Sequence, residues 1–132
     1  MFYTLDITTS NKIEFLDITE KIQDIIKKSK IYKGICTIYI PHTTAGVTIN
    51  ENADPTVKED MIKELNKIIP FNDGYKHVEG NSSAHIKSSL VGISETIIIE
   101  KNKLVLGTWQ GIYFSEFDGP RKRSINIKII EE

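Results

Sequence analysis

The alternation of apolar and polar residues predicts a chain built mostly of short strands. Apolar side chains recur at every second position over several short stretches, which is the period of a half-buried strand. The strands that this pattern predicts are residues 2–8, 13–16, 35–40, 46–50, 95–100, 103–106, 112–117 and 124–130. Short turns favour three hairpins among them, which join 2–8 to 13–16, 95–100 to 103–106, and 112–117 to 124–130.

Apolar residues spaced three and four apart predict helices in three other places. Asp17 precedes the first helix, whose apolar stripe is Ile18, Ile22, Ile25 and Ile26. Asp54 and Pro55 open the second helix, whose predicted buried stripe is Val57, Met61, Leu65 and Ile68. Asn81 is the predicted cap of a short third helix, which runs over residues 82–91 and ends at Gly92.

Short connections between these elements favour antiparallel pairing, and the chain has no Gly/Pro/Ser-rich linker or internal repeat. We therefore predict an α+β fold: one domain over residues 1–132, formed as an antiparallel β-sandwich with two longer helices and one short helix. Residues 97–99 are all isoleucine, so that strand is apolar on both faces. A helix or a neighbouring subunit should cover its second face.

Composition narrows the classes of function. The chain of 132 residues is 39% hydrophobic and 27% charged, which is typical of a soluble globular domain. A net charge of −1 gives no electrostatic footprint for nucleic acid. No apolar run approaches the roughly 18 residues of a membrane span, and the first residues lack the pattern of a secretion signal. We expect a cytoplasmic protein without a nucleic-acid or membrane partner. The single cysteine, Cys36, shares a strand face with Ile38, so we expect a reduced, buried packing residue.

Candidate chemistry concentrates between His77 and His85. With a helix over residues 82–91, His85 lies near the end of its first turn and His77 lies in the loop before it, so both imidazoles can point at one spot. The helix start also offers free backbone N–H groups that suit an anion. Imidazole is the commonest side-chain metal ligand. The stretch indicates part of a site for a metal and an anion, or a pair of surface histidines, since the spacing is no recognised ligand motif.

Other polar residues gather at predicted strand ends, in segments 41–46, 50–54, 107–111 and 116–121. Loops that a rigid sheet carries are where binding groups tend to collect. If these loops meet at one end of the sheet, they surround His77 and His85.

The same segments carry a family resemblance that covers essentially the whole chain. They read PHTTAGVTINENADP at 41–55, His77 with EGN at 79–81, AHIK at 84–87, LVG at 90–92, GTWQGIYF at 107–114 and EFDGPR at 116–121. In these motifs the chain resembles the YjbQ-like family, often labelled secondary thiamine-phosphate synthase. The resemblance implies a compact α+β antiparallel sandwich, assembly as a homotrimer, and a cleft whose histidines hold a divalent metal, with zinc as the expected ion.

The resemblance favours a metal site formed by His42, His77 and His85, because all three histidines fall in matching segments. Three imidazoles without a fourth protein ligand would leave an open position, which is the pattern of catalytic zinc. Glu51 and Glu79 are the nearest candidates to orient the imidazoles or to act as a general base. For Glu79 the alternative is a solvated loop residue.

Arg121 has a planar guanidinium suited to phosphate, and Lys122 and Arg123 follow it; a surface ion pair is the alternative for this run. Trp109 offers a stacking face for a planar ring, or packs in the core or against another subunit. The other candidate substrate-binding residues are polar groups of the same loops: Thr43, Thr44, Asn50, Asn81, Ser82, Gln110 and Asp118.

We therefore predict an enzyme that acts on a small phosphorylated molecule, with Glu51, Glu79 and Arg121 as catalytic residues. The resemblance implies thiamine-phosphate synthase, a transferase that joins an aminopyrimidine methyl diphosphate to a thiazole phosphate. The alternatives are a metal-dependent hydrolase of a phosphorylated metabolite and a non-catalytic trimeric protein that binds one.

Overall fold

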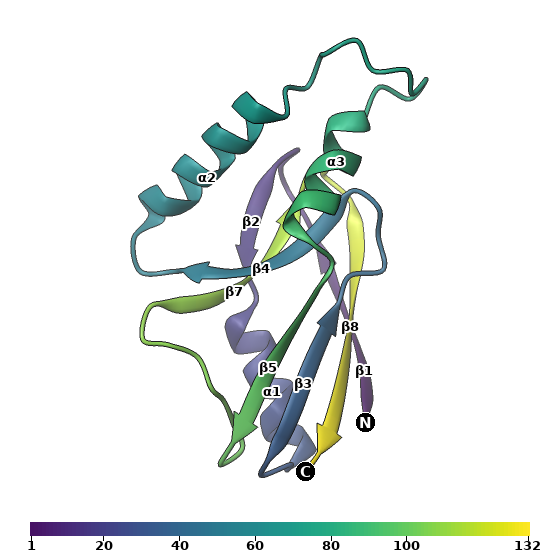
Figure 1. The fold of residues 1–132 in the computed structure, drawn as a ribbon. Helices are drawn as coiled ribbons and strands as arrows, with labels where there is room; N and C mark the ends of the chain where they lie inside the picture. Colours follow the sequence, from purple (N-terminus) through teal and green to yellow (C-terminus); the bar gives the residue numbers. More distant parts are fainter.

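Two antiparallel sheets of unequal size make up the frame of the computed structural model, which describes residues 1–132 (Figure 1). The larger sheet has the strand order β1-β8-β3-β5-β6, and the smaller has the order β2-β7-β4. The strands are β1 (Phe2–Thr8), β2 (Glu14–Asp17), β3 (Gly34–Tyr39), β4 (Ala45–Glu51), β5 (Ser94–Glu100), β6 (Lys103–Leu104), β7 (Gln110–Glu116) and β8 (Lys122–Glu131). The helices are α1 (Thr19–Ser29), α2 (Pro55–Ile68) and α3 (Ser82–Val91). The predicted α+β antiparallel sandwich with three helices is confirmed.

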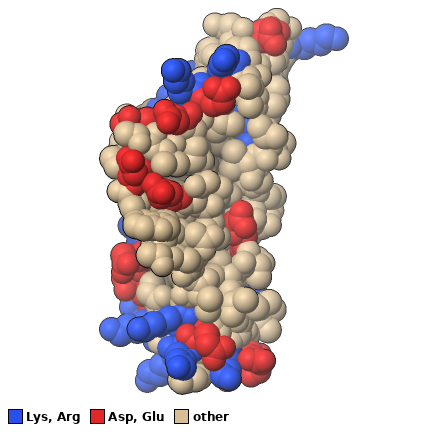
Figure 2. Space-filling model, turned by 60° about the vertical axis from the view of Figure 1, so that its left-hand side comes forward, with Lys and Arg blue, Asp and Glu red and all other residues tan.

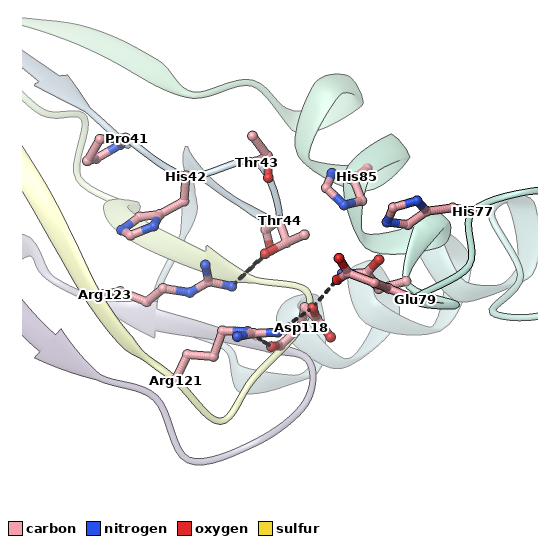
Figure 3. Close-up of a pocket in the computed structure, with 11 residues that line it drawn as sticks. Pro41, His42, Thr43, Thr44, His77, Glu79, His85, Asp118, Arg121 and Arg123 are labelled. Carbon is pink, nitrogen blue, oxygen red and sulfur yellow. Dashed lines mark hydrogen bonds and ion pairs between the residues drawn. The ribbon is translucent and has the colours of Figure 1, made fainter.

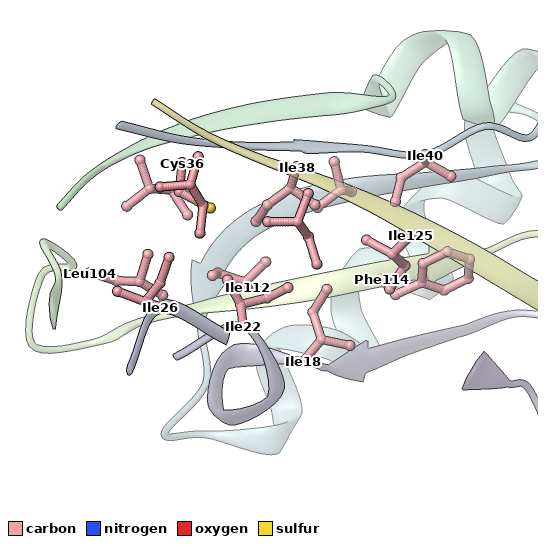
Figure 4. Close-up of a cluster of buried hydrophobic side chains, with 14 of the residues drawn as sticks. Ile18, Ile22, Ile26, Cys36, Ile38, Ile40, Leu104, Ile112, Phe114 and Ile125 are labelled. Atoms are coloured by element: carbon pink, nitrogen blue, oxygen red, sulfur yellow. The ribbon is translucent and has the colours of Figure 1, made fainter. Parts of the chain in front are cut away.

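The main core lies between the two sheets and α1 (Figure 4). Alternate residues of each strand point into it, so Ile125 and Ile127 of β8 meet Ile112 and Phe114 of β7. The predicted isoleucine stripe closes one side of this core, since the α1 residues Ile22 and Ile26 and the preceding Ile18 are all buried. Apolar burial is the main favourable term in folding, so these inward faces fix how the sheets stack.

Cys36 lies in this core on β3, the central strand of the larger sheet, as predicted. Its thiol is free, and burial raises the pKa of Cys36 to about 11. The cysteine is therefore a packing residue.

Helices α2 and α3 cover the other face of the smaller sheet (Figure 1). Phe15 packs edge-to-face against Tyr113 and Phe117 there, with ring centroids 6.3 and 6.2 Å apart, and Met61 and Leu65 of α2 pack against these rings. None of the residues of α2 is fully buried, and Ile68 is 58% exposed. The predicted stripe of α2 therefore faces the sheet at Met61 and Leu65 but is only partly buried, because the helix lies on the outside of the sheet (Figure 1); burial of Ile68 in its last turn is wrong.

Two of the three predicted hairpins are wrong. β1 pairs with β8 and β2 pairs with β7, so neither β1–β2 nor β7–β8 forms a pair. The physical reason is that both connections cross between the sheets and bond to each other: the Thr9 N–H donates to the Arg121 carbonyl, and the Gly119 N–H donates to the Lys12 carbonyl, both at 2.9 Å. The β5–β6 hairpin is confirmed.

Helix α3 begins and ends where the sequence predicts, between Asn81 and Gly92. The Asn81 side chain does not cap the helix, however: its Nδ2 donates to Asp118 Oδ2 at 2.9 Å, and its Oδ1 has no hydrogen-bond partner within the chain. At the other end, the backbone of α3 touches the start of β4. A Cβ at Gly46 would lie 2.4 Å from the Gly92 oxygen, and that oxygen accepts a hydrogen bond from the Val47 N–H at 3.0 Å. The end of α3 is thus held directly over β4.

No helix covers the outer face of the larger sheet (Figure 1). In register, Ile35 of β3 lies between Ile98 of β5 and Ile130 of β8, and these side chains are 39%, 58% and 53% exposed. The prediction that a helix covers the second face of residues 97–99 is therefore wrong. The alternative, that a neighbouring subunit covers it, stays a prediction. None of the helices has both the length and the apolar character that a membrane crossing requires.

Candidate functional site

One polar pocket of about 500 Å³ collects most of the candidate residues (Figure 3). It lies where the β3–β4 connection, the start of α3 and the β7–β8 connection meet. Its lining is Pro41, His42, Thr43, Thr44, His77, Glu79, Asn81, His85, Asp118, Arg121 and Arg123. Most of the predicted site residues therefore come together, although the lining is drawn from positions between 41 and 123 of the sequence.

Arg123 forms one wall of the pocket and is held by a buried ion pair with Glu116. The side chains of Arg123 and Glu116 are 5% and 0% exposed. Arg123 Nε donates to Glu116 Oε1 at 2.9 Å, and Nη2 donates to Glu116 Oε2 and to Thr44 Oγ1. The Thr9 hydroxyl donates to Glu116 Oε1 at 2.7 Å. Burial alone would raise the pKa of Glu116, but the hydrogen bonds from Arg123 and Thr9 hold that pKa below its usual value.

Arg121 is held in a second, more exposed network with Asp118. Arg121 Nε donates to the Asp118 carbonyl at 2.8 Å, and Nη2 donates to Asp118 Oδ2 at 3.0 Å. The same carboxylate accepts from Asn81, which ties the β7–β8 connection to the start of α3. Burial opposes ionisation of Asp118, yet the bonds from Asn81 and Arg121 lower its pKa. The ion pair that was the alternative for Arg121 therefore forms, and it lies within the pocket lining.

The imidazoles of His77 and His85 lie together, as predicted, with ring centroids 5.5 Å apart in an edge-to-face arrangement. His42 lies on the opposite side of the pocket, beside Arg123 (Figure 3). The Ser124 N–H donates to His42 Nε2 at 2.9 Å, which leaves the ring proton of the neutral form on Nδ1. Burial lowers the pKa of His42, and the charge of Arg123 lowers it further. His42 is therefore a neutral donor toward its surroundings.

A zinc ion on all three imidazoles does not fit this arrangement within one chain. The chain contains no group of three His, Cys, Asp or Glu side chains that is placed to hold a metal ion. A ligand must offer a free lone pair, and that of His42 Nε2 accepts the bond from Ser124. His77 and His85 are close enough to share an ion, so a metal on these two histidines stays a prediction.

Comparison with known proteins agrees with the resemblance seen in the motifs. The family described as "UPF0047 protein YjbQ-like" matches residues 3–132. The chain belongs to this YjbQ-like family. It is 58% identical to the UPF0047 protein MJ1081 of Methanocaldococcus jannaschii, over 98% of this chain and 94% of that protein. It is 50% identical to the UPF0047 protein YugU of Bacillus subtilis, over 98% and 99% of the two chains.

Solved structures show the same fold. A YjbQ/UPF0047 protein of Clostridium acetobutylicum has a TM-score of 0.95 at 54% identity, over 97% of this chain and 99% of that one. A protein of Sulfolobus solfataricus, described as YbjQ-like and of unknown function, also has a TM-score of 0.95, at 32% identity over 100% and 97% of the chains. The fold of the YjbQ-like chain is therefore the fold of its family.

Four predicted site residues of this YjbQ-like chain lie away from the pocket: Asn50, Glu51, Trp109 and Gln110. They lie at the far end of the smaller sheet, because Glu51 pairs with Gln110 at one end of β4 while Ala45 pairs with Glu116 at the other. A strand of seven residues spans roughly 20 Å. The expectation that all the loops surround the histidines is wrong for these four, and Glu51 cannot reach the pocket from within one chain. Ser82 lines a neighbouring hollow with His77 and His85.

The sequence interpretation missed the importance of Arg123 and Glu116, because Arg123 was grouped with a turn of surface charges. The alternation of inward and outward side chains along a strand could have identified both residues. Arg123 is in phase with the buried Ile125 and Ile127 of β8, and Glu116 is in phase with the buried Phe114 of β7. Two opposite charges that both point toward the inside of a sandwich indicate a buried pair.

Replacing Glu116 by glutamine removes the carboxylate and leaves Arg123 buried without a countercharge. We expect Glu116→Gln to lower the free energy of unfolding at pH 7 by about 3–5 kcal/mol, measured by urea denaturation. The pKa of Glu116 is lower in the folded state than its ordinary value of 4.5. The deficit should therefore be complete above about pH 4.5 and shrink as the pH falls through the folded-state pKa. Glu59→Gln, an exposed change on α2, is the control; equal losses in both variants would refute the role of the pair.

Proposed function

We propose that the pocket binds a small phosphorylated molecule and that the protein is an enzyme acting on it. The observation that carries this proposal is the pair of arginines in the pocket lining. Arg121 and Arg123 are both fixed by bonds from Nε and Nη2, and in both residues Nη1 has no partner within the chain. A fixed guanidinium with free N–H groups is a strong donor to a phosphate oxygen.

The balance of donors and acceptors supports an anionic ligand. The carboxylates of Glu116 and Asp118 are already engaged by Arg123 and Arg121. The hydroxyl of Thr44 accepts from Arg123 and keeps its own proton for donation. Thr43 and neutral His42 add further donors to the lining. A phosphate group can only accept hydrogen bonds from these donors, so it complements them.

Glu79 is the carboxylate of the lining that makes no hydrogen bond within the chain. In the enzyme that we propose, the arginines bind the phosphate or diphosphate group and stabilise the negative charge that grows on it as it leaves. For a thiamine-phosphate synthase, the bond from the pyrimidine methylene carbon to diphosphate breaks, and a bond from that carbon to the thiazole nitrogen forms. Glu79 is then a candidate to position the organic groups.

Hydrolysis of a phosphorylated metabolite is the second candidate, and the free carboxylate of Glu79 favours it. Glu79 lies across the pocket from Arg123 (Figure 3). In this second proposal, the Glu79 carboxylate takes a proton from a water that attacks a phosphate held by the arginines. A wild-type protein that binds phosphate esters and converts none of them would instead be a binding protein.

Arg121→Met should weaken the binding of glycerol phosphate by roughly 10- to 100-fold, because a charged hydrogen bond contributes about 1.5–3 kcal/mol. The matched control is Lys122→Met, which removes the same charge from the next residue, an exposed one outside the pocket lining. Isothermal titration calorimetry of the wild type and both variants measures the effect. Equal weakening in both variants would mean a general effect of charge and would contradict the site.

We propose a zinc ion on His77 and His85 as the metal of this site. Zinc-supplied His77→Ala and His85→Ala should each lose the zinc that the wild type keeps, measured by plasma mass spectrometry against protein concentration. His42→Ala should keep its zinc, because His42 already accepts a bond from Ser124. Full zinc content in both His77→Ala and His85→Ala would rule this metal site out.

We further propose that the protein acts as a cytoplasmic homotrimer. Support comes from the open row of Ile35, Ile98 and Ile130 on the larger sheet and from Trp109, which is 63% exposed. Figure 2 also shows that charged residues are sparse across the middle of the side of the molecule that it turns forward, where a few acidic ones lie at the edges, and that most of them gather toward the upper and lower ends. Exposed apolar surface without charge is typical of a subunit contact.

The trimer predicts a mass near three times 15.0 kDa in sedimentation equilibrium at micromolar concentration. Ile98→Lys should shift the protein toward the mass of one chain, because a charge would be buried in the contact. Thr8→Lys, an exposed change at the end of the edge strand β1, is the control. A wild-type mass of one chain would contradict the trimer.

A further inference from the structure

A second hollow of about 480 Å³ adjoins the pocket on the far side of His85. Its lining is His42, Thr43, His85, Ser88, Ser89, Gly92 and Ile93. His42, Thr43 and His85 also line the pocket, so the two spaces lie next to each other with these three side chains between them.

The two spaces differ in chemistry. The pocket lining includes two arginines and two carboxylates, whereas the lining of the hollow contains no Lys, Arg, Asp or Glu. The hydroxyl of Ser88 is already bonded to the Ala45 carbonyl at 2.6 Å. The side chains that remain toward the open space are those of His42, Thr43, His85, the exposed Ser89, and Ile93, which is 37% exposed. Because none of them carries a full charge, an uncharged organic group suits this surface.

The backbone keeps the hollow open. α3 ends at Gly92 with φ +98, and a Cβ built at Gly92 would meet no atom within 4 Å, so the missing side chain leaves this wall free. The Gly92 oxygen is held by the Val47 N–H, and the Ile93 oxygen is held by the Ile40 N–H at 2.8 Å. The wall is therefore fixed on both sheets, which makes the hollow a preformed space.

We propose that this hollow receives the uncharged organic part of the phosphate ester whose anionic group lies in the pocket. The inference rests on the proposed function and specifies its substrate class, a phosphate monoester with a compact ring or branched alkyl group. His85 and Thr43 form the passage between the two parts. Ser89 and Ile93 then select the organic group, while Arg121 and Arg123 hold the phosphate.

A third hollow provides an internal control. It lies on the other side of His85 and is lined by Tyr75, Lys76, His77, Ser82, His85 and Ile86. Ser89 and Ile86 are both exposed residues of α3, and each lines only one of the two side hollows. Tryptophan at either position places the same indole ring on the same helix, in a different hollow.

The test uses calorimetric titration of the full chain with methyl phosphate and benzyl phosphate. The wild type should bind benzyl phosphate roughly 10-fold or more tightly than methyl phosphate, because the ring is buried in the hollow. Ser89→Trp should lose this preference and keep its affinity for methyl phosphate, whereas Ile86→Trp should retain the preference. Circular dichroism establishes that each variant is folded, and variants with other bulky residues, such as Ser89→Leu, replace any that is not.

Three results would overturn the inference: no preference in the wild type, a preference that survives in Ser89→Trp, or one that is lost in Ile86→Trp. Failure of the proposed function looks different, because methyl phosphate itself would then not bind, or would bind equally well to Arg121→Met. If methyl phosphate binds in a way that depends on Arg121, but benzyl phosphate binds no more tightly, the role of the second hollow is refuted and the proposed function is not.

Discussion

The buried ion pair between Arg123 and Glu116 is the interaction on which the rest of the structure depends, because it joins the two sheets. Arg123 belongs to β8 of the larger sheet and Glu116 to β7 of the smaller one. Thr9 and Thr44 attach the end of β1 and the approach to β4 to the same pair. Removing two charges from water costs several kcal/mol per ion unless their hydrogen bonds are satisfied. Here hydrogen bonds from several sides satisfy the pair. The same side chains that join the two sheets also form a wall of the pocket.

Local patterns predicted the elements well and their partners poorly. The isoleucine stripe of α1, the limits of α3 and the β5–β6 hairpin follow from periodicity, caps and a short turn, all of which act within a few residues. Alternation shows that a strand has two faces, but it does not say which strand lies beside it. The β1–β2 and β7–β8 connections are short enough for hairpins, yet they cross between the sheets because each bonds to the other.

The candidate site shows the same difference between what local sequence predicts and what it does not. His77 and His85 are near in sequence and near in space, so the sequence was enough to bring them together. His42 and Arg121 came from the family motifs and from the tendency of loops to hold binding groups. Glu51 and Trp109 satisfied the same criteria but lie at the other end of β4 and β7, and the sequence does not show which loops share an end of a sheet. Arg123 could have been found from its phase with Ile125, had the strand period been followed through the charged turn.

The position of Cys36 makes the centre of the larger sheet observable in solution. With a pKa of about 11, only about one thiol in ten thousand is ionised at neutral pH, and the thiolate is the reactive form. The side chain is also fully enclosed on β3, between β8 and β5. A thiol-specific label can therefore attach only while the core around Cys36 is open. Because the chain has no other cysteine, the labelling rate reports how often the core opens at Cys36, and no substitution is needed to measure it.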